Sequence, residues 1–196
     1  MIFEIKIYLC ELFMNSDKMN QIIPIASDHG GYEMKQFLIE KLRESGYEVK
    51  DYGTDSTESV DYPDMIHPLA KAIETGEYPI GIILCGSGNG AQMTANKHPH
   101  VRAALCWNEE LAQLARQHND ANIMALPGRF IPFDQAWRMV QIFLSTPFEG
   151  GRHARRAKGR APGKRRQAGF YASGRKFVTL ISKAVRCRLP VSVTLM

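Results

Sequence analysis

The stretch that decides the fold is the apolar run Ile80-Gly-Ile-Ile-Leu84, followed at once by Cys85-Gly86-Ser87-Gly88-Asn89-Gly90. The apolar run is typical of a buried strand, and the glycines permit a tight turn that exposes backbone N–H groups. A helical pattern follows over residues 91–97, so the stretch predicts a thiol beside amide donors that can hold an anion. A plain strand-to-helix turn with a buried cysteine would give the same local pattern.

Strand and helix patterns alternate from residue 21 to about residue 146. Strands are predicted where short apolar runs end at turn residues, and helices where apolar residues recur with helical spacing. The predicted strands cover residues 22–26, 47–51, 79–84, 101–106 and 122–126, and the predicted helices cover 32–45, 64–75, 91–97, 109–117 and 133–144. This alternation predicts an α/β domain with a parallel sheet covered on both faces, which binds ligands beyond the carboxyl ends of its strands.

The net charge of +5 combines two regions of opposite sign. Of the 25 Lys and Arg residues, 13 lie from Arg152 onward, where there is no Asp or Glu. The first 151 residues carry 12 basic and 20 acidic residues, so the body is acidic and the basicity belongs to a tail. We therefore expect an extension over 1–18, a domain over 19–156, and a basic tail over 157–196 that is dispensable for fold and catalysis.

The four cysteines, Cys10, Cys85, Cys106 and Cys187, show no paired spacing. This favours reduced thiols in a cytoplasmic protein over a disulfide framework or a zinc site. With 44% hydrophobic residues the chain can form a core, and its longest apolar stretches are shorter than the roughly 20 residues of a membrane helix. Residues 1–18 lack the basic start and cleavage site of a signal peptide.

Polar clusters lie near the ends of the predicted strands. Asp28-His29-Gly30-Gly31 follows the first strand, Asp61-Tyr62-Pro63 ends the loop after the second, His118-Asn119 precedes the fifth, Arg129 follows it, and 149–156 follows the final helix. Each has an ordinary structural interpretation, such as a helix cap or a solvated charge. Together they predict a base, an acid, anion-binding amides and phosphate-binding basic groups, all at the functional edge of one sheet.

In these motifs the chain resembles ribose-5-phosphate isomerase type B, a family that also includes galactose-6-phosphate and allose-6-phosphate isomerases. The resemblance covers about residues 20–156. It rests on motifs that occur in order and at family-like spacing: Asp28-His29-Gly30-Gly31, Asp61-Tyr62-Pro63, Cys85-Gly86-Ser87-Gly88-Asn89-Gly90, Ala95-Asn96-Lys97, Arg116-Gln117-His118-Asn119-Asp120 and Glu149-Gly150-Gly151-Arg152-His153.

The resemblance implies a Rossmann-like three-layer α/β/α fold whose five parallel strands lie in the order 2-1-3-4-5. It implies a homodimer, sometimes paired into tetramers, with active sites shared between subunits. The implied reaction interconverts ribose 5-phosphate and ribulose 5-phosphate, a step of the non-oxidative pentose phosphate pathway, through an enediolate and without metal or cofactor. No nucleic-acid or membrane partner is expected.

The resemblance also assigns roles to residues. Cys85 matches the general base, because the glutamate that another branch of the family uses six residues later is replaced here by Ala91. Ser87 matches the hydroxyl that moves a proton between the substrate oxygens, and His118 the acid that opens the furanose ring. Asp28 matches a residue near the sugar hydroxyls that is assigned both a catalytic and a substrate-binding role. The remaining matches contact substrate: His29, Tyr62, Gly86, Gly88, Asn89, Gly90, Asn119, Arg129, Arg152 and Arg156.

Three other functions remain open. The same motifs would serve an isomerase for a six-carbon sugar phosphate. A dinucleotide-binding oxidoreductase is a weaker interpretation, because the glycine loop is not GxGxxG and follows the third strand, although Glu109 lies at a suitable distance. The basic tail could bind nucleic acid in a salt-dependent manner, but it shows no aromatic platform.

Overall fold

The computed structural model describes residues 21–159. The expected extension over residues 1–18 and the tail from residue 160 lie outside the described residues, as do Cys10 and Cys187. No helix in the described part of the chain is long and apolar enough to cross a membrane.

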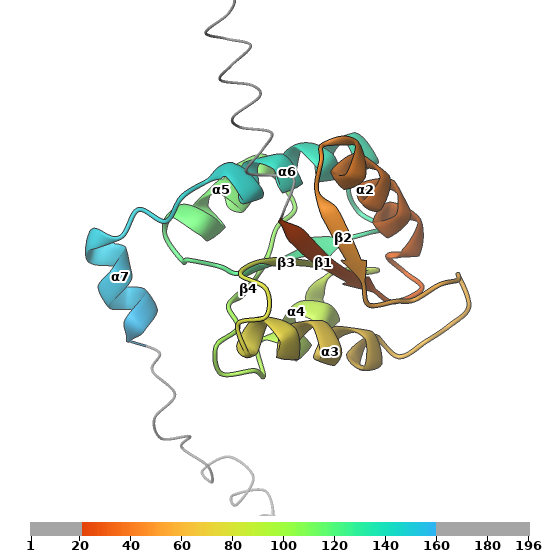
Figure 1. Ribbon diagram of the computed structural model, residues 1–196, viewed down its shortest axis with the longest axis horizontal. Helices are drawn as coiled ribbons and strands as arrows, with labels where there is room; N and C mark the ends of the chain where they lie inside the picture. The colour runs from red at the N-terminus through yellow and green to blue at the C-terminus, as the bar shows by residue number, and fades with distance from the viewer. Residues whose placement is uncertain (1–20, 160–196) are drawn as a thin grey trace, which may run out of the picture. The chain divides into compact units, whose positions relative to one another are not determined.

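Five parallel strands form one sheet at the centre of the described domain (Figure 1). The strands are β1 (Ile22–Ser27), β2 (Glu48–Asp51), β3 (Gly81–Cys85), β4 (Ala103–Leu105) and β5 (Ile123–Pro127). The three middle strands β1, β3 and β5 are almost completely buried because both of their faces are covered. The predicted α/β class with a five-stranded parallel sheet is therefore confirmed.

The strand order is β2-β1-β3-β5-β4, so the expected order 2-1-3-4-5 is wrong at its last two positions. The physical reason is the difference in burial between the two strands. All five residues of β5 are buried, which suits a strand with neighbours on both sides. Strand β4 has only three residues and two of them are half-buried, which suits the edge of a sheet.

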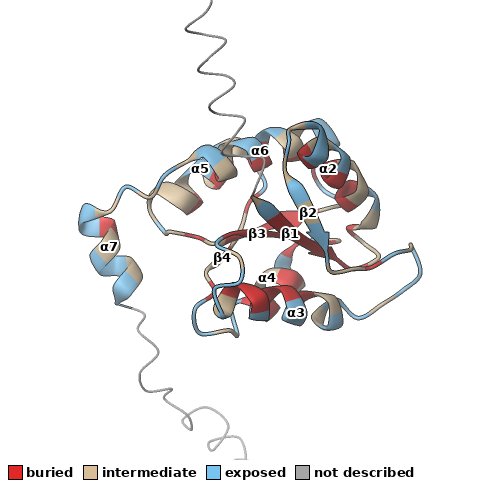
Figure 2. Cartoon of the chain, in the orientation of Figure 1, coloured by how far each residue is buried: buried red, intermediate tan, exposed pale blue. Residues whose placement is uncertain are grey.

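Helices cover both faces of the sheet, as the predicted layers require (Figures 1 and 2). One face carries α2 (Tyr32–Glu44), α5 (Glu109–Gln117) and α6 (Phe133–Ser145), and its core includes Ile25, Leu84, Leu126 and Phe143. The other face carries α3 (Tyr62–Glu74) and α4 (Asn89–Ala95), with Ile83, Cys85 and Ala125 in its core. The buried residues of these five helices recur with helical spacing, which explains why sequence periodicity predicted all five.

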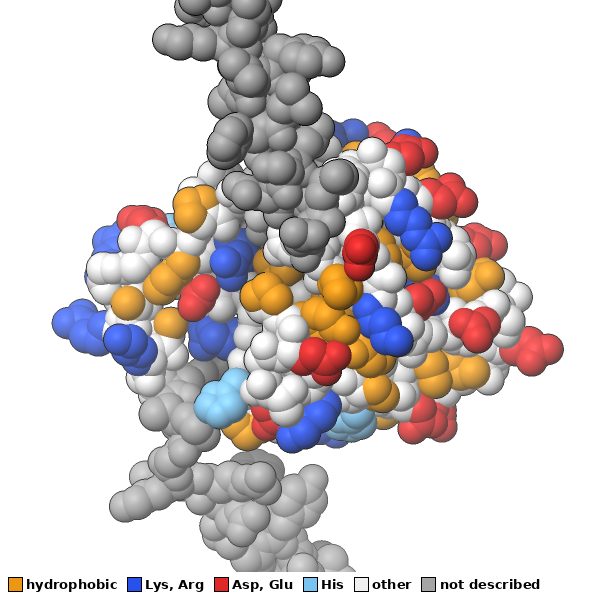
Figure 3. Space-filling view, viewed as in Figure 1, with side chains coloured by type: hydrophobic (Ala, Val, Ile, Leu, Met, Phe, Trp, Pro, Cys, Tyr) orange, Lys and Arg blue, Asp and Glu red, His pale blue; other side chains and the backbone are white. Residues whose placement is uncertain are grey.

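One helix was not predicted from periodicity. Helix α7 (Gly151–Lys158) follows the last core helix and continues through the expected domain boundary at residue 156. His153 is its single buried residue, so the segment has no apolar stripe to reveal it. In the space-filling view, Lys and Arg side chains gather on the α7 side of the visible face, and acidic side chains on the α2 side (Figure 3).

Candidate active site

The thiol of Cys85 lies at the carboxyl end of the central strand β3 and is 4% exposed. Its Sγ accepts a hydrogen bond from the backbone N–H of Gly88 at 3.0 Å. Donation of an N–H to sulfur stabilises the negatively charged thiolate form. The exposed residues Ser87 and Asn89 flank this buried sulfur, and the Asn89 N–H points to Ser87 Oγ at 3.4 Å. The loop therefore places the thiol of Cys85 beside the backbone N–H of Gly88.

A second buried thiol, that of Cys106, has the opposite surroundings. Its Sγ donates to the carbonyl oxygen of Ala104 at 3.6 Å, so its partner favours the protonated form. Burial raises the pKa of Cys106 to about 12. Both cysteines are free, and the direction of the hydrogen bond together with the burial of Cys106 distinguishes the candidate base from an inert core thiol.

The Cys85 loop can close tightly only because glycines stand at two of its positions. Gly88 has a left-handed backbone (φ 76°), and a Cβ there would lie 2.4 Å from Leu105 Cδ1. At Gly90 a Cβ would lie 2.8 Å from Cζ of Tyr62. The Tyr62 ring thus packs directly on the loop while remaining 38% exposed.

The loop after β5 brings a guanidinium to the same place. Arg129 donates its backbone N–H to the Gly86 carbonyl at 3.1 Å, and Gly128 donates to the Cys85 carbonyl at 2.9 Å. The Arg129 side chain crosses Gly86, where its Cδ lies 3.6 Å from the position that a Cβ would take. A fixed positive charge therefore lies beside the loop that carries the thiol.

The loop after β1 supplies a carboxylate and an imidazole. Asp28 is 7% exposed, and its Oδ1 accepts the N–H groups of Gly30 at 2.9 Å and Gly31 at 3.2 Å. The Nδ1 of His29 accepts the Val60 N–H at 3.2 Å, which ties this loop to the segment just before Tyr62. A Cβ on Gly30 would lie 2.8 Å from the Gly86 nitrogen, so this loop packs against the Cys85 loop.

A buried lysine that sequence reasoning did not single out braces this edge. Lys35 is fully buried, and its Nζ donates to Asp51 Oδ1 at 2.7 Å and to the Thr54 carbonyl at 2.8 Å. Asp51 Oδ1 also accepts the Gly53 N–H at 2.9 Å. The ion pair of Lys35 and Asp51 joins α2 to the end of β2, from which the loop to Tyr62 begins. An isolated Lys inside a helix gave no signal for this, because a lysine is expected at the surface.

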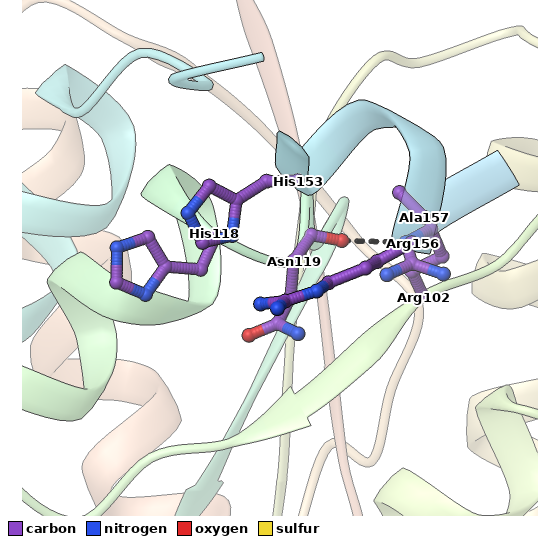
Figure 4. Close-up of a pocket in the computed structure, with 6 residues that line it drawn as sticks. All are labelled: Arg102, His118, Asn119, His153, Arg156 and Ala157. Carbon is purple, nitrogen blue, oxygen red and sulfur yellow. Dashed lines mark hydrogen bonds between the residues drawn. The ribbon is translucent and has the colours of Figure 1, made fainter. Parts of the chain in front are cut away.

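The predicted residues His118, Asn119 and Arg156 lie together elsewhere, in a pocket of about 430 Å³ (Figure 4). Arg152 does not line this pocket, but its Nε donates to His153 Nε2 at 3.1 Å. The pocket is lined by Arg102, His118, Asn119, His153, Arg156 and Ala157. The Arg102 Nε donates to the Asn119 carbonyl at 2.6 Å. Arg102 precedes β4, His118 and Asn119 precede β5, and the other residues belong to α7. We call this group the α7 pocket.

The expectation that all candidate residues share one edge of the sheet is wrong. Cys85 pairs with Pro127 at the carboxyl end of β5, whereas His118 comes before Ile123 at its amino end. Four residue steps at about 3.3 Å each place these two ends of β5 about 13 Å apart. Because every strand is parallel, a residue that precedes a strand must lie at the edge opposite to one that follows it. Within one chain, the α7 pocket therefore does not meet the Cys85 loop.

Glu149 links the two histidines of the α7 pocket. Its Oε2 lies 3.4 Å from His118 Nε2 and 4.0 Å from His153 Nε2, and its N–H donates to the Gln117 carbonyl at 3.0 Å. The two imidazole rings stack with their centroids 4.2 Å apart and their planes within 5°. Burial lowers the pKa of His153, and the positive charges of His118, Arg152 and Arg156 lower it further, against the opposing effect of Glu149.

Three ligand atoms of His118, Glu149 and His153 lie within 4.8 Å of one another, a spacing that could hold a metal ion. The charges around them oppose this. Arg102 and Arg156 line the same pocket, and Arg152 Nε donates to His153 Nε2 at 3.1 Å, which occupies the lone pair that a metal would need. The group is therefore better suited to an anion such as phosphate.

The described domain is a parallel α/β domain whose candidate site is a thiol beside a backbone amide and a guanidinium. Residues 23–159 match the family model described as Ribose/Galactose Isomerase, so the chain belongs to that family.

Individual relatives agree with this membership. Ribose-5-phosphate isomerase B of Escherichia coli strain K12 is 40% identical over 136 residues, which are 69% of this chain and 91% of that protein. A solved ribose 5-phosphate isomerase from Thermotoga maritima is 46% identical with a TM-score of 0.71, covering 74% of this chain and 99% of that one. A Mycoplasma genitalium ribose-5-phosphate isomerase B, solved with bound ribulose 5-phosphate, is 39% identical with a TM-score of 0.69, covering 71% and 93%.

Proposed function

We propose that this chain is an aldose–ketose isomerase that interconverts ribose 5-phosphate and ribulose 5-phosphate. The observation that carries the proposal is the Cys85 thiol, which is buried at the end of β3, accepts the Gly88 N–H and lies in the same loop cluster as Arg129. Membership of the isomerase family and 40% identity to ribose-5-phosphate isomerase B of Escherichia coli support the same reaction.

The proposed chemistry begins with the open-chain aldose. The Cys85 thiolate removes the proton from C2, and the electron pair of that C–H bond moves toward the C1 carbonyl oxygen to give an enediolate. Donors around Gly86–Gly90 stabilise the negative charge. The Ser87 hydroxyl transfers the proton of the C2 oxygen to the C1 oxygen, and the thiol returns its proton to C1. Atoms and charges balance, and the product is the 2-ketose.

Ring opening and phosphate binding are proposed for the α7 pocket. His118 would protonate the ring oxygen of the furanose, because an imidazole can release a proton near neutral pH. Arg152 and Arg156, exposed on one helix, have the forked donors that suit a phosphate. Asn119 lines the α7 pocket together with His118 and Arg156.

We propose that the complete active site forms between two copies of the chain. The Cys85 loop and the α7 pocket lie at opposite edges of one sheet, so a second copy must supply the α7 pocket to each Cys85 loop. Large apolar side chains are exposed near the carboxyl edge: Met93 at 63%, Trp107 at 53% and Phe130 at 74%. Such side chains suit burial against a partner subunit, and a twofold dimer would form two equivalent sites.

The alternative substrate is a six-carbon aldose phosphate such as galactose 6-phosphate or allose 6-phosphate, which needs the same proton transfers. Reduced, buried Cys85 and Cys106 fit a cytoplasmic enzyme of the non-oxidative pentose phosphate pathway.

The test is an isomerisation assay with ribose 5-phosphate, galactose 6-phosphate and allose 6-phosphate. We expect the highest kcat/KM with ribose 5-phosphate. Preference for a six-carbon substrate would select the alternative. Absence of turnover with all three would reject the isomerase proposal, and stabilisation by NAD would then favour a dinucleotide enzyme.

A further inference from the structure

His153 is a buried histidine in the α7 pocket that the proposed mechanism does not use. It is 4% exposed, and its ring lies flat against the ring of His118 at 4.2 Å. Two imidazolium rings stacked at this distance would repel each other, so the pair holds one proton more readily than two. Where that single proton resides decides whether His118 can act as an acid.

The hydrogen-bond partners of the two stacked rings indicate which ring nitrogens carry a proton. The Arg152 guanidinium has donors and no acceptor, and its Nε lies 3.1 Å from His153 Nε2. The His153 Nε2 must therefore accept, which makes His153 a neutral imidazole with its proton on Nδ1. His118 Nε2 instead faces the Glu149 carboxylate at 3.4 Å, which stabilises an N–H at that atom.

We propose that His153 is a positioning residue that, held neutral by Arg152 and stacked on His118, keeps the proton of the pair on His118 facing Glu149. This inference rests on the proposed role of His118 as the acid that opens the sugar ring. It explains why two imidazoles and a carboxylate lie together: one imidazole carries the proton, the other fixes its ring plane, and the carboxylate orients the N–H.

The other charged groups around the stack act in opposing directions. Arg102 reaches the pocket from the segment before β4, and Arg156 reaches it from α7. Both guanidiniums disfavour a second positive charge on the stack, whereas Glu149 stabilises one. The arrangement therefore supports a singly protonated pair, and the burial that lowers the pKa of His153 agrees with this.

The direct test is a ¹⁵N NMR titration of the imidazole rings in the full-length chain, with the six histidines assigned by substitution. As the pH falls, His118 should take up its proton first, while His153 stays in the neutral Nδ1–H form. Arg152→Leu should raise the titration midpoint of His153 by about one pH unit relative to Arg155→Leu. Arg155 is the matched control, because it is exposed on the same helix and carries the same charge. Protonation of His153 before His118, or equal shifts in both variants, would overturn the inference.

A kinetic test separates positioning from general support of the fold. His153→Gln should lower turnover of ribose 5-phosphate roughly 10- to 100-fold, because the His118 ring loses its stacking partner. It should change turnover of 4-deoxyribose 5-phosphate little, since that analogue lacks the oxygen that closes the furanose ring. His153→Phe keeps a flat ring and should recover much of the lost turnover.

Equal losses with both substrates, or no recovery in His153→Phe, would contradict the positioning role. A different result is expected if His118 is not the acid that opens the sugar ring. In that case His118→Ala itself would affect both substrates equally, while the order of protonation seen by NMR would still decide the inference about His153.

Discussion

The Cys85 loop and the α7 pocket are built in opposite ways. The Cys85 loop is buried, and backbone groups and glycines define it: the Gly88 N–H on sulfur, and close packing of Tyr62 on Gly90. The α7 pocket is formed mainly by polar and basic side chains from the segment before β4, the end of α5 and α7, and only His153 among its lining residues is buried. The first is suited to fixed chemistry at one carbon atom, and the second to binding a solvated, charged group.

The two regions therefore suit different parts of the proposed reaction. Proton abstraction needs a base and oxyanion donors whose positions do not change, which a central strand and its loop provide. Ring opening and phosphate binding need a titratable group and forked cations, which long side chains on a helix provide. Substitutions should therefore affect the two regions differently.

The largest expected effect is in the Cys85 loop. Cys85→Ala should lower turnover about 10²- to 10⁴-fold with substrate binding largely retained, because it removes the proposed general base. Cys106→Ala is the matched control, since Cys106 is also buried and free but its thiol donates to a carbonyl. Steady-state kinetics and substrate titration measure both effects. Near-normal turnover in Cys85→Ala would show that another group is the base.

A smaller and selective effect is expected in the α7 pocket. His118→Ala should lower turnover of ribose 5-phosphate by about 10²-fold, the lower range for loss of a general acid. Turnover of 4-deoxyribose 5-phosphate should remain, because this substrate has no ring to open. The comparison of kcat for the two substrates is the measurement. Equal losses would assign His118 to orientation or structure instead.

The buried Lys35 near the Cys85 loop should contribute to the stability of the fold. Lys35→Met should lower the free energy of unfolding by about 1–3 kcal/mol, because it leaves the buried Thr54 carbonyl without its partner, whereas the partly exposed Asp51 carboxylate can regain water. Lys41→Met on the same helix removes an exposed pair with Glu44 and should cost less than about 1 kcal/mol. Urea denaturation of both variants measures this difference, and equal losses would refute a bracing role for Lys35.

A further effect on stability is expected only at alkaline pH. Cys106 has its pKa raised to about 12 by burial, so the folded protein retains this proton at a pH where the unfolded chain has lost it. The folded state then binds more protons than the unfolded state, and stability falls as the pH rises from about 9 toward 12. Cys106→Ala should show a shallower fall over this range in denaturation curves. An identical slope would contradict the assignment.

The sequence was sufficient to predict most of the fold, because β3 and β5 are uninterrupted apolar runs and each core helix has a clear buried stripe. The order of β4 and β5 was missed, since pairing depends on which strand is buried on both sides. Helix α7 was missed because residues 151–158 have one buried side chain and therefore no apolar period.

The candidate site also has a part that the sequence predicts and a part that it does not. The Cys85 loop follows from local sequence, since its glycines, thiol and hydroxyl are contiguous. The opposite location of His118 could also have been inferred, because it precedes a parallel strand instead of following one. Lys35, Arg102 and the stacking of His153 depend on contacts between distant segments, which no local pattern encodes.

The most direct test of the central claim is subunit complementation between Cys85→Ala and His118→Ala chains. If each site joins the Cys85 loop of one copy to the α7 pocket of another, neither variant alone converts ribose 5-phosphate efficiently, but a mixed dimer contains one intact site and one doubly altered site. After random exchange of subunits between equal amounts of the two variants, half of the dimers are mixed. About one quarter of the activity of the unaltered protein should therefore return. No recovery in dimers shown to be mixed would mean that both regions act within one chain, and would contradict the account.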